Sequence, residues 1–260
     1  RPAENLCYQM DLNIYVAPVS GGGFVTQLGL VSALYDAKKI ANPITTSSRD
    51  YSPDVVMASS GGNVMTYIAM AGGWSSSGIR IVLQRLRAEM FVGSWIPGGP
   101  SWLALPSTGS IYRRGIGSED LFSCLYTSMS IQRTEVWTGV FDQSLLRARM
   151  YCNRRVEDCL IKPHHFNPIA SMYATRPLSY LNGNIADIAK VCYGSAAIPF
   201  VTQAQPFQDT VIADGGTMFA SPLSVLDRSL RPIIVKGNRK LRLFYICSYN
   251  MEEYSPDLTS

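Results

Sequence analysis

Twice within residues 12–74, an apolar run leads into a glycine cluster and then into a stretch with helical spacing. The first unit joins LNIYVAPVS, residues 12–20, to a helix-like stretch over 21–40. The second joins DVVMAS, residues 54–59, to a helix-like stretch that begins at Gly61 and ends at Gly72-Gly73. Uninterrupted apolar strands that alternate with helices are typical of parallel sheets covered on both faces. The pattern therefore predicts an α/β fold.

The rest of the chain gives less regular signals. Residues 79–93 have helical spacing, whereas 94–110 are broken by proline and glycine and rich in tryptophan, which predicts a loop with an apolar surface. Residues 143–161 are compatible with one helix or with a strand followed by a helix. The other expected elements are strands over 134–142, 210–216, 231–236 and 242–250, and a helix over 184–199.

No internal repeat and no change in composition marks a linker, so we expect a single domain over residues 1–260. The chain begins at Arg1 without a methionine, which suggests a region of a longer protein or a processed product. Residues 55–74 carry no charge and are long enough to cross a membrane. Their glycines and polar residues favour a buried strand and a buried helix instead.

Composition excludes some classes of function. Apolar residues make up 47% of the chain and charged residues 16%, as in a globular protein. The net charge is +4, but there is no dense basic run and no nucleic-acid motif, so we expect no nucleic-acid partner. Arginine outnumbers lysine, which favours phosphate-bearing surfaces or is ordinary surface charge.

The six cysteines include no Cys-x-x-Cys pair, so we expect free thiols in a reducing compartment. The sequence does not determine the location, although a cytoplasmic or peripheral membrane location is favoured. A zinc site built from Cys152, Cys159, His164 and His165 is the alternative, but their spacing matches no usual zinc pattern. We therefore expect no metal and no cofactor.

Gly21, Gly22 and Gly23 lie between an expected strand and an expected helix. Glycine lets the backbone approach a ligand closely, and the amides at the start of a helix favour negative charge. The turn therefore suits a phosphate or a developing oxyanion, although a tight turn without a ligand explains it equally well. It is not a Walker motif, because no Gly-Lys-Ser or Gly-Lys-Thr follows.

Ala58-Ser59-Ser60-Gly61-Gly62 matches the frame small-x-Ser-x-Gly of a nucleophile elbow, with Ser60 as the nucleophile. The sharp turn crowds its flanking residues, so Ala58 and Gly62 have to be small. It also raises the serine oxygen at a helix N-terminus, where negative charge is favoured. Ser59 is the other candidate, but its frame puts Met57 where a small residue is needed.

A serine nucleophile requires a base. His164 and His165 are the histidines of the chain, in the loop-like segment IKPHHFNP, and would make a histidine-triad esterase. Asp214 is the alternative, at the end of the expected strand VIAD and before Gly215-Gly216. The residues alone leave both possibilities open.

Taken together, GGG at 21–23, ASSGG at 58–62, GSAAIPFV at 194–201 and VIADGGTMFASPL at 211–223 resemble the patatin-like phospholipase family, in the same order. The resemblance covers residues 12 to 226, with a poorly matched middle. It implies a three-layer sandwich in which a central, mostly parallel sheet is flanked by helices. It also implies a lipid acyl hydrolase with a Ser–Asp dyad and no metal.

Carried over, the resemblance makes Ser60 the nucleophile and Asp214 the general base, and it puts the oxyanion hole at Gly21, Gly22 and Gly23. The implied partners are a phospholipid or another acyl lipid, and the membrane surface that contains it. The family's basic residue after the glycines is replaced here by Phe24-Val25-Thr26, and its elbow glycine by Ala58. A patatin-like fold used as a binding or structural module is therefore the alternative.

The loop MFVGSWIPGGPSWLAL, residues 90–105, is dense in large apolar side chains. Loops usually lie at the surface, and tryptophan suits the boundary between membrane and water. We expect Trp95 and Trp102 to border the substrate entrance and to contact lipid. A flap that packs onto the core is the alternative.

Overall fold

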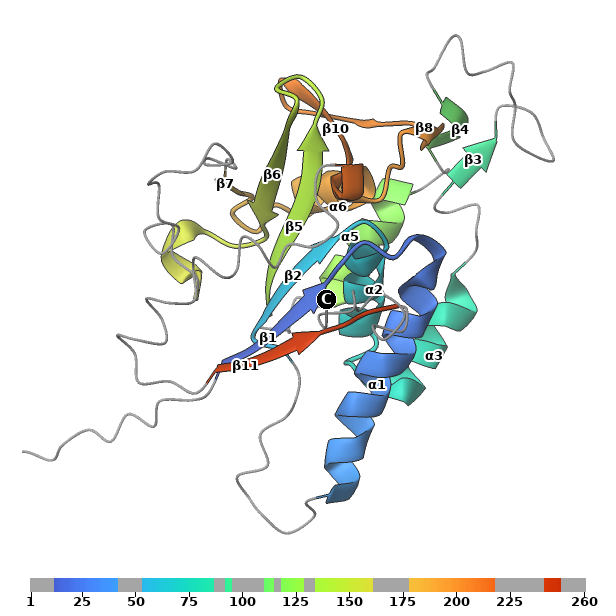
Figure 1. Cartoon of the computed structure of the whole chain (residues 1–260), viewed down its shortest axis with the longest axis vertical. Coiled ribbons are helices and arrows are strands. Elements are labelled where there is room, and N and C mark those ends of the chain that lie inside the picture. Colours follow the sequence, from blue (N-terminus) through green and yellow to red (C-terminus); the bar gives the residue numbers. More distant parts are fainter. Residues whose placement is uncertain are drawn as a thin grey trace, which may run out of the picture.

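The computed structural model of the chain describes residues 12–41, 53–86, 92–94, 110–114, 118–128, 134–160, 178–217 and 241–248. An eight-stranded sheet forms its centre (Figure 1). The strand order is β11-β1-β2-β5-β10-β9, with β6 beside β5 and β7 beside β6. The strands are β1 (Leu12–Ala17), β2 (Val55–Ser59), β5 (Glu135–Asp142), β6 (Arg147–Cys152), β7 (Leu178–Tyr180), β9 (Gln205–Phe207), β10 (Thr210–Asp214) and β11 (Leu241–Tyr245).

The expected α/β fold is confirmed: a mostly parallel central sheet is flanked by helices, which is consistent with a three-layer sandwich. Strands β11, β1, β2 and β5 run parallel to one another, whereas β10 is antiparallel to β5 and to β9, and β6 is antiparallel to β5. A short 3-10 helix η1 (Gly21–Gly23) precedes the first helix. The helices are α1 (Phe24–Ala41), α2 (Gly61–Ala71), α3 (Ser76–Arg85), α5 (Ser118–Ser128) and α6 (Ile185–Ser195).

Both faces of the central strands are buried, which explains their uninterrupted apolar sequences. On one face, Tyr15, Val56 and Val136 belong to a core with residues of α1, α2, α5 and α6. On the other face, Ile14 and Met57 belong to a second core that includes residues of β6. Within the described ranges, no helix is both long enough and apolar enough to cross a membrane.

The middle of the chain differs from the sequence expectations. The helix predicted over 79–93 ends at Arg85, because Leu86 is extended, and Val92–Ser94 is strand β3. This strand pairs with β4 (Ser110–Arg114), which pairs with β8 (Phe200–Thr202) in a small separate sheet. Residues 143–161 contain a turn, strand β6 and the 3-10 turn η4 (Val156–Asp158), so the single-helix interpretation is wrong. The strand expected over 231–236 lies outside the described residues.

Candidate active site

The turn between β2 and α2 holds Ser60 in a strained conformation. Ser60 has φ 54° and ψ −131°, in the positive-φ region that residues other than glycine rarely adopt. A Cβ at Gly61 would collide with the Gly21 carbonyl oxygen, and one at Gly62 with the Ala17 carbonyl oxygen. Because these obstacles are backbone atoms, the elbow cannot relax around a larger residue. Ala58 in β2 is fully buried, as a small flanking residue has to be.

Strand β10 places Asp214 directly against this serine. The Ser60 hydroxyl donates a hydrogen bond of 2.5 Å to Asp214 Oδ2. The other carboxylate oxygen, Oδ1, accepts a 2.7 Å bond from the Gly216 amide. Ser60 is 2% exposed and Asp214 4%. The two residues proposed from sequence as nucleophile and base therefore lie within hydrogen-bond distance, although 154 positions separate them.

Burial sets the proton affinity of this aspartate. It raises the pKa of Asp214 above its ordinary value of 3.8, whereas the hydrogen bonds from Ser60 and from the Gly216 amide lower it. The net result is a raised pKa. A carboxylate with a raised pKa accepts a proton more readily than an exposed aspartate.

Ser195 at the end of α6 supports the elbow, a contact that the sequence analysis did not assign. Its hydroxyl accepts a 3.1 Å hydrogen bond from the Ser60 amide and donates a 2.7 Å bond to the Gly139 carbonyl of β5. Ser195 is fully buried. One signal for this role is present in the sequence: Ser195 lies in GSAAIP, one of the segments that resemble the patatin-like family. The contact ties the elbow to the neighbouring strand.

The glycine turn lies beside Ser60, since Gly21 and Gly22 border the same pocket. Gly21 has φ 50°, which favours glycine, and the Gly23 amide donates to the Ser20 carbonyl at 2.7 Å. Gly23 therefore uses its N–H inside the turn, whereas Gly21 and Gly22 line the pocket that contains Ser60.

Gln27, also missed in the sequence, holds this turn in place. It is fully buried, and its amide nitrogen donates to the Ile246 carbonyl at 2.8 Å. Its side-chain oxygen accepts a 2.9 Å hydrogen bond from the Ser20 hydroxyl. The turn is thereby tied to the segment that follows β11.

A pocket of about 480 Å³ opens above Ser60. Apart from Ser60, the glycine backbone and Thr202, its walls are largely apolar. The larger lining residues are Phe24, Val64, Leu83, Leu86, Phe122, Tyr193 and Ile198. A volume of this size suits a small organic ligand or part of a larger one.

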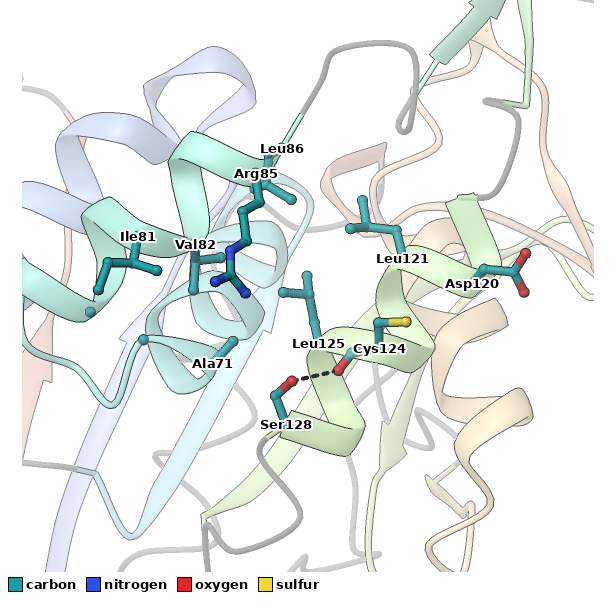
Figure 2. Close-up of a pocket in the computed structure, with 12 residues that line it drawn as sticks. Ala71, Ile81, Val82, Arg85, Leu86, Asp120, Leu121, Cys124, Leu125 and Ser128 are labelled. Atoms are coloured by element: carbon teal, nitrogen blue, oxygen red, sulfur yellow. Dashed lines mark hydrogen bonds between the residues drawn. The ribbon is translucent and has the colours of Figure 1, made fainter.

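A second, larger pocket of about 670 Å³ lies between α3 and α5 (Figure 2). Val82 and Leu125 extend into it from opposite helices, and Arg85 and Asp120 carry opposite charges at its sides. Ser60 does not line it, but Leu86 lines both pockets. The two pockets are therefore neighbours, and only the smaller one contains the serine.

Exposed apolar side chains lie next to the Ser60 pocket. Phe200 in β8 is 72% exposed and has φ 65°, and its neighbours Ile198 and Val201 are also exposed. Ile198 and Thr202 line the pocket itself. These residues form an apolar rim that the sequence analysis did not identify.

Four predicted residues lie outside the described residues: Trp95, Trp102, His164 and His165. The entrance role of the tryptophans and the histidine-triad alternative stay predictions. The sequence matches no protein-family model and no curated protein, so the functional argument depends on the geometry of the site.

Proposed function

We propose that this protein is a lipid acyl hydrolase of the phospholipase A type, with the Ser–Asp dyad of a patatin-like enzyme. The observation that carries the proposal is the 2.5 Å hydrogen bond from the strained Ser60 to the buried Asp214. A nucleophile and a base in direct contact are the minimum for acyl transfer. The apolar pocket in front of Ser60 supports a fatty-acyl group as the part of the substrate that is bound.

In the proposed reaction, Asp214 accepts the Ser60 proton while Ser60 Oγ attacks the ester carbonyl carbon. The negative charge on the carbonyl oxygen is stabilised on the side of Gly21, Gly22 and the α2 N-terminus. When the tetrahedral intermediate collapses, the ester bond breaks and the leaving alcohol takes the proton from Asp214. A water then attacks the acyl-Ser60 ester while Asp214 takes a proton from it. As the ester bond breaks, Asp214 returns this proton to Ser60 Oγ and the fatty acid is released.

The apolar rim supports a substrate presented at a lipid surface. Ile198, Phe200 and Val201 expose large apolar side chains beside the pocket, and Val25 does so near the glycine turn. Removing such side chains from water at a membrane surface is favourable. The proposed partner is therefore a membrane surface, bound peripherally, or a micelle that contains phospholipid or another acyl lipid.

Covalent labelling of the serine tests the proposal. A fluorophosphonate probe is expected to label the purified protein rapidly at Ser60, because Asp214 activates that hydroxyl. Peptide mass spectrometry should locate the adduct, Ser60→Ala should abolish it, and Ser59→Ala should retain it. Absence of labelling, together with no fatty-acid release from phosphatidylcholine vesicles, would overturn the enzyme assignment.

The second candidate is a binding or structural module with weak or no catalysis. The observation that favours it is the glycine turn, which lacks a following basic residue and commits the Gly23 amide to Ser20. On this reading, vesicle binding survives in Ser60→Ala and the unmodified protein releases no fatty acid. The same vesicle experiment therefore separates the two functions.

A further inference from the structure

Three buried groups gather on the face of the sheet that lies away from the Ser60 pocket. Glu135 begins β5, Cys152 ends β6, and Cys159 follows η4. All three are buried, and their potential ligand atoms lie within 4.8 Å of one another. The two sulfur atoms are 3.4 Å apart, well beyond the length of a disulfide bond, so both cysteines are free thiols.

The Glu135 carboxylate is held in a fixed orientation. Trp137 donates from its indole nitrogen to Glu135 Oε1 at 2.6 Å, and the Leu160 amide donates to Oε2. Hydrogen bonds of this kind orient the ligands in metal sites and reduce the cost of placing them. Cys159 is also positioned, because its thiol contacts the Arg155 carbonyl at 3.1 Å.

A fourth polar side chain, Tyr180 of β7, lies on the same face of the sheet. Among the described residues, the Tyr180 hydroxyl is buried without a hydrogen-bond partner. Tyr180 pairs in register with Cys152, and its ring packs edge-on against that of Trp137, the donor to Glu135, with the ring centroids 5.6 Å apart. A buried hydroxyl without a partner is costly, and a bound ion or its water would satisfy it.

We propose that Cys152, Cys159 and Glu135 bind a Zn²⁺ ion, with the fourth ligand on the side of the Tyr180 hydroxyl. Two thiolates and one carboxylate are a donor set that suits zinc, whereas calcium and magnesium prefer oxygen ligands alone. On binding, two Zn–S bonds and one Zn–O bond form, and each thiol releases one proton to solvent. No electron is transferred.

The position of this site indicates a structural role. Glu135 starts β5, and Gly139, which pairs with Ser59 beside the elbow, lies four residues farther along, roughly 13 Å in a strand. The ion would tie the segment between Cys152 and Cys159 to the start of β5. The expectation that hydrolysis itself needs no metal is unaffected. The site shares Cys152 and Cys159 with the sequence-based zinc alternative, whose His164 and His165 lie outside the described residues.

Metal content of the purified full chain tests the proposal. Protein expressed with zinc in the medium and then dialysed should contain about one zinc ion per chain by elemental mass spectrometry. Cys152→Ser and Cys159→Ser should each lower zinc affinity by about tenfold or more. Cys192→Ser, which removes another buried thiol, is the matched control and should keep its zinc.

Cobalt substitution gives a second readout that needs no variant to fold. The unmodified protein loaded with Co²⁺ should show a thiolate-to-cobalt charge-transfer band, and zinc should displace it. Zinc-free protein that is folded by circular dichroism and gives no such band would overturn the proposal. Recovery of Cys152 and Cys159 as a disulfide-linked peptide from freshly purified protein would overturn it as well.

Discussion

The pair of strands β5 and β10 contains two buried aspartates with very different surroundings. Asp142 pairs in register with Ile212, and Asp214 pairs with Val140, so the two lie two register positions apart. Asp142 Oδ1 accepts hydrogen bonds from Thr210 at 2.6 Å and from the Leu145 amide at 3.1 Å. Its Oδ2 lies 3.4 Å from the Arg149 guanidinium.

Asp214 has a hydroxyl and one amide as its hydrogen-bond donors, and within the described ranges no cation pairs with it. A buried carboxylate next to a cation is stabilised in its charged form, whereas burial without one makes a carboxylate more basic. Burial alone therefore does not identify a catalytic acid or base. What distinguishes Asp214 is that no cation of the described residues neutralises it and that its partner is a serine hydroxyl.

The largest expected effect that separates the two aspartates is on catalysis. Asp214→Asn should lower ester hydrolysis by about 10²- to 10⁴-fold, because the amide cannot accept the Ser60 proton. Asp142→Asn should keep the rate of the unmodified protein. Ser60→Ala combined with Asp214→Asn should be hardly worse than Ser60→Ala alone, because the dyad acts as a unit. The rate of hydrolysis of a soluble short-chain ester compares the four variants with the unmodified protein, and an active Asp214→Asn would refute the dyad.

The free energy of unfolding should fall when Asp142 is replaced, by a smaller effect than the loss of catalysis in Asp214→Asn. Asp142→Asn should lower the free energy of unfolding by about 1–3 kcal/mol, because it leaves Arg149 and two donors with weaker partners. Urea denaturation monitored by circular dichroism gives this value. Asp209→Asn, in the exposed turn before β10, is the control and should change little. Equal losses of unfolding free energy in Asp142→Asn and Asp209→Asn would show that the buried contacts of Asp142 contribute nothing specific.

The pH dependence of catalysis should follow the pKa of Asp214. Because the ionised carboxylate is the base and burial raises its pKa above 3.8, kcat/KM should fall as the pH drops through that raised pKa. A profile from about pH 3 to about pH 8 covers this range. A kcat/KM that stays constant down to the ordinary pKa of 3.8 would contradict a role for Asp214 as the base.

The smallest expected effect is a gain of stability in Asp214→Asn. The folded protein holds the Asp214 proton more tightly than the unfolded chain, so its stability falls as the pH rises through the window above 3.8. Asparagine removes the buried charge, so this variant should melt at a higher temperature than the unmodified protein at neutral pH. The difference should shrink below the ordinary pKa, and a lower melting temperature at neutral pH would contradict this account.

Much of the fold and the site could be predicted because local chemistry dictates it. Apolar runs followed by glycine turns and helical spacing identified β1, β2 and their helices. Small residues on both sides of Ser60 identified the elbow, since a sharp turn excludes larger ones. The prediction of a helix over 79–93 was wrong beyond Arg85. Helical spacing continues past that residue, but Val92–Ser94 pairs with β4, a partner that no local pattern reveals.

By itself the sequence determined which segments become strands, turns and helices at the elbow, and which serine and aspartate are the candidates. Only the tertiary structure decided that Ser60 and Asp214 touch, that Ser195 binds the elbow amide, and that Cys152 and Cys159 share a buried site with Glu135. The physical reason is the range of the interactions. Propensity and periodicity act over a few residues, whereas sheet register and helix packing bring together groups far apart in the chain, and they also decide which buried carboxylate receives a cation.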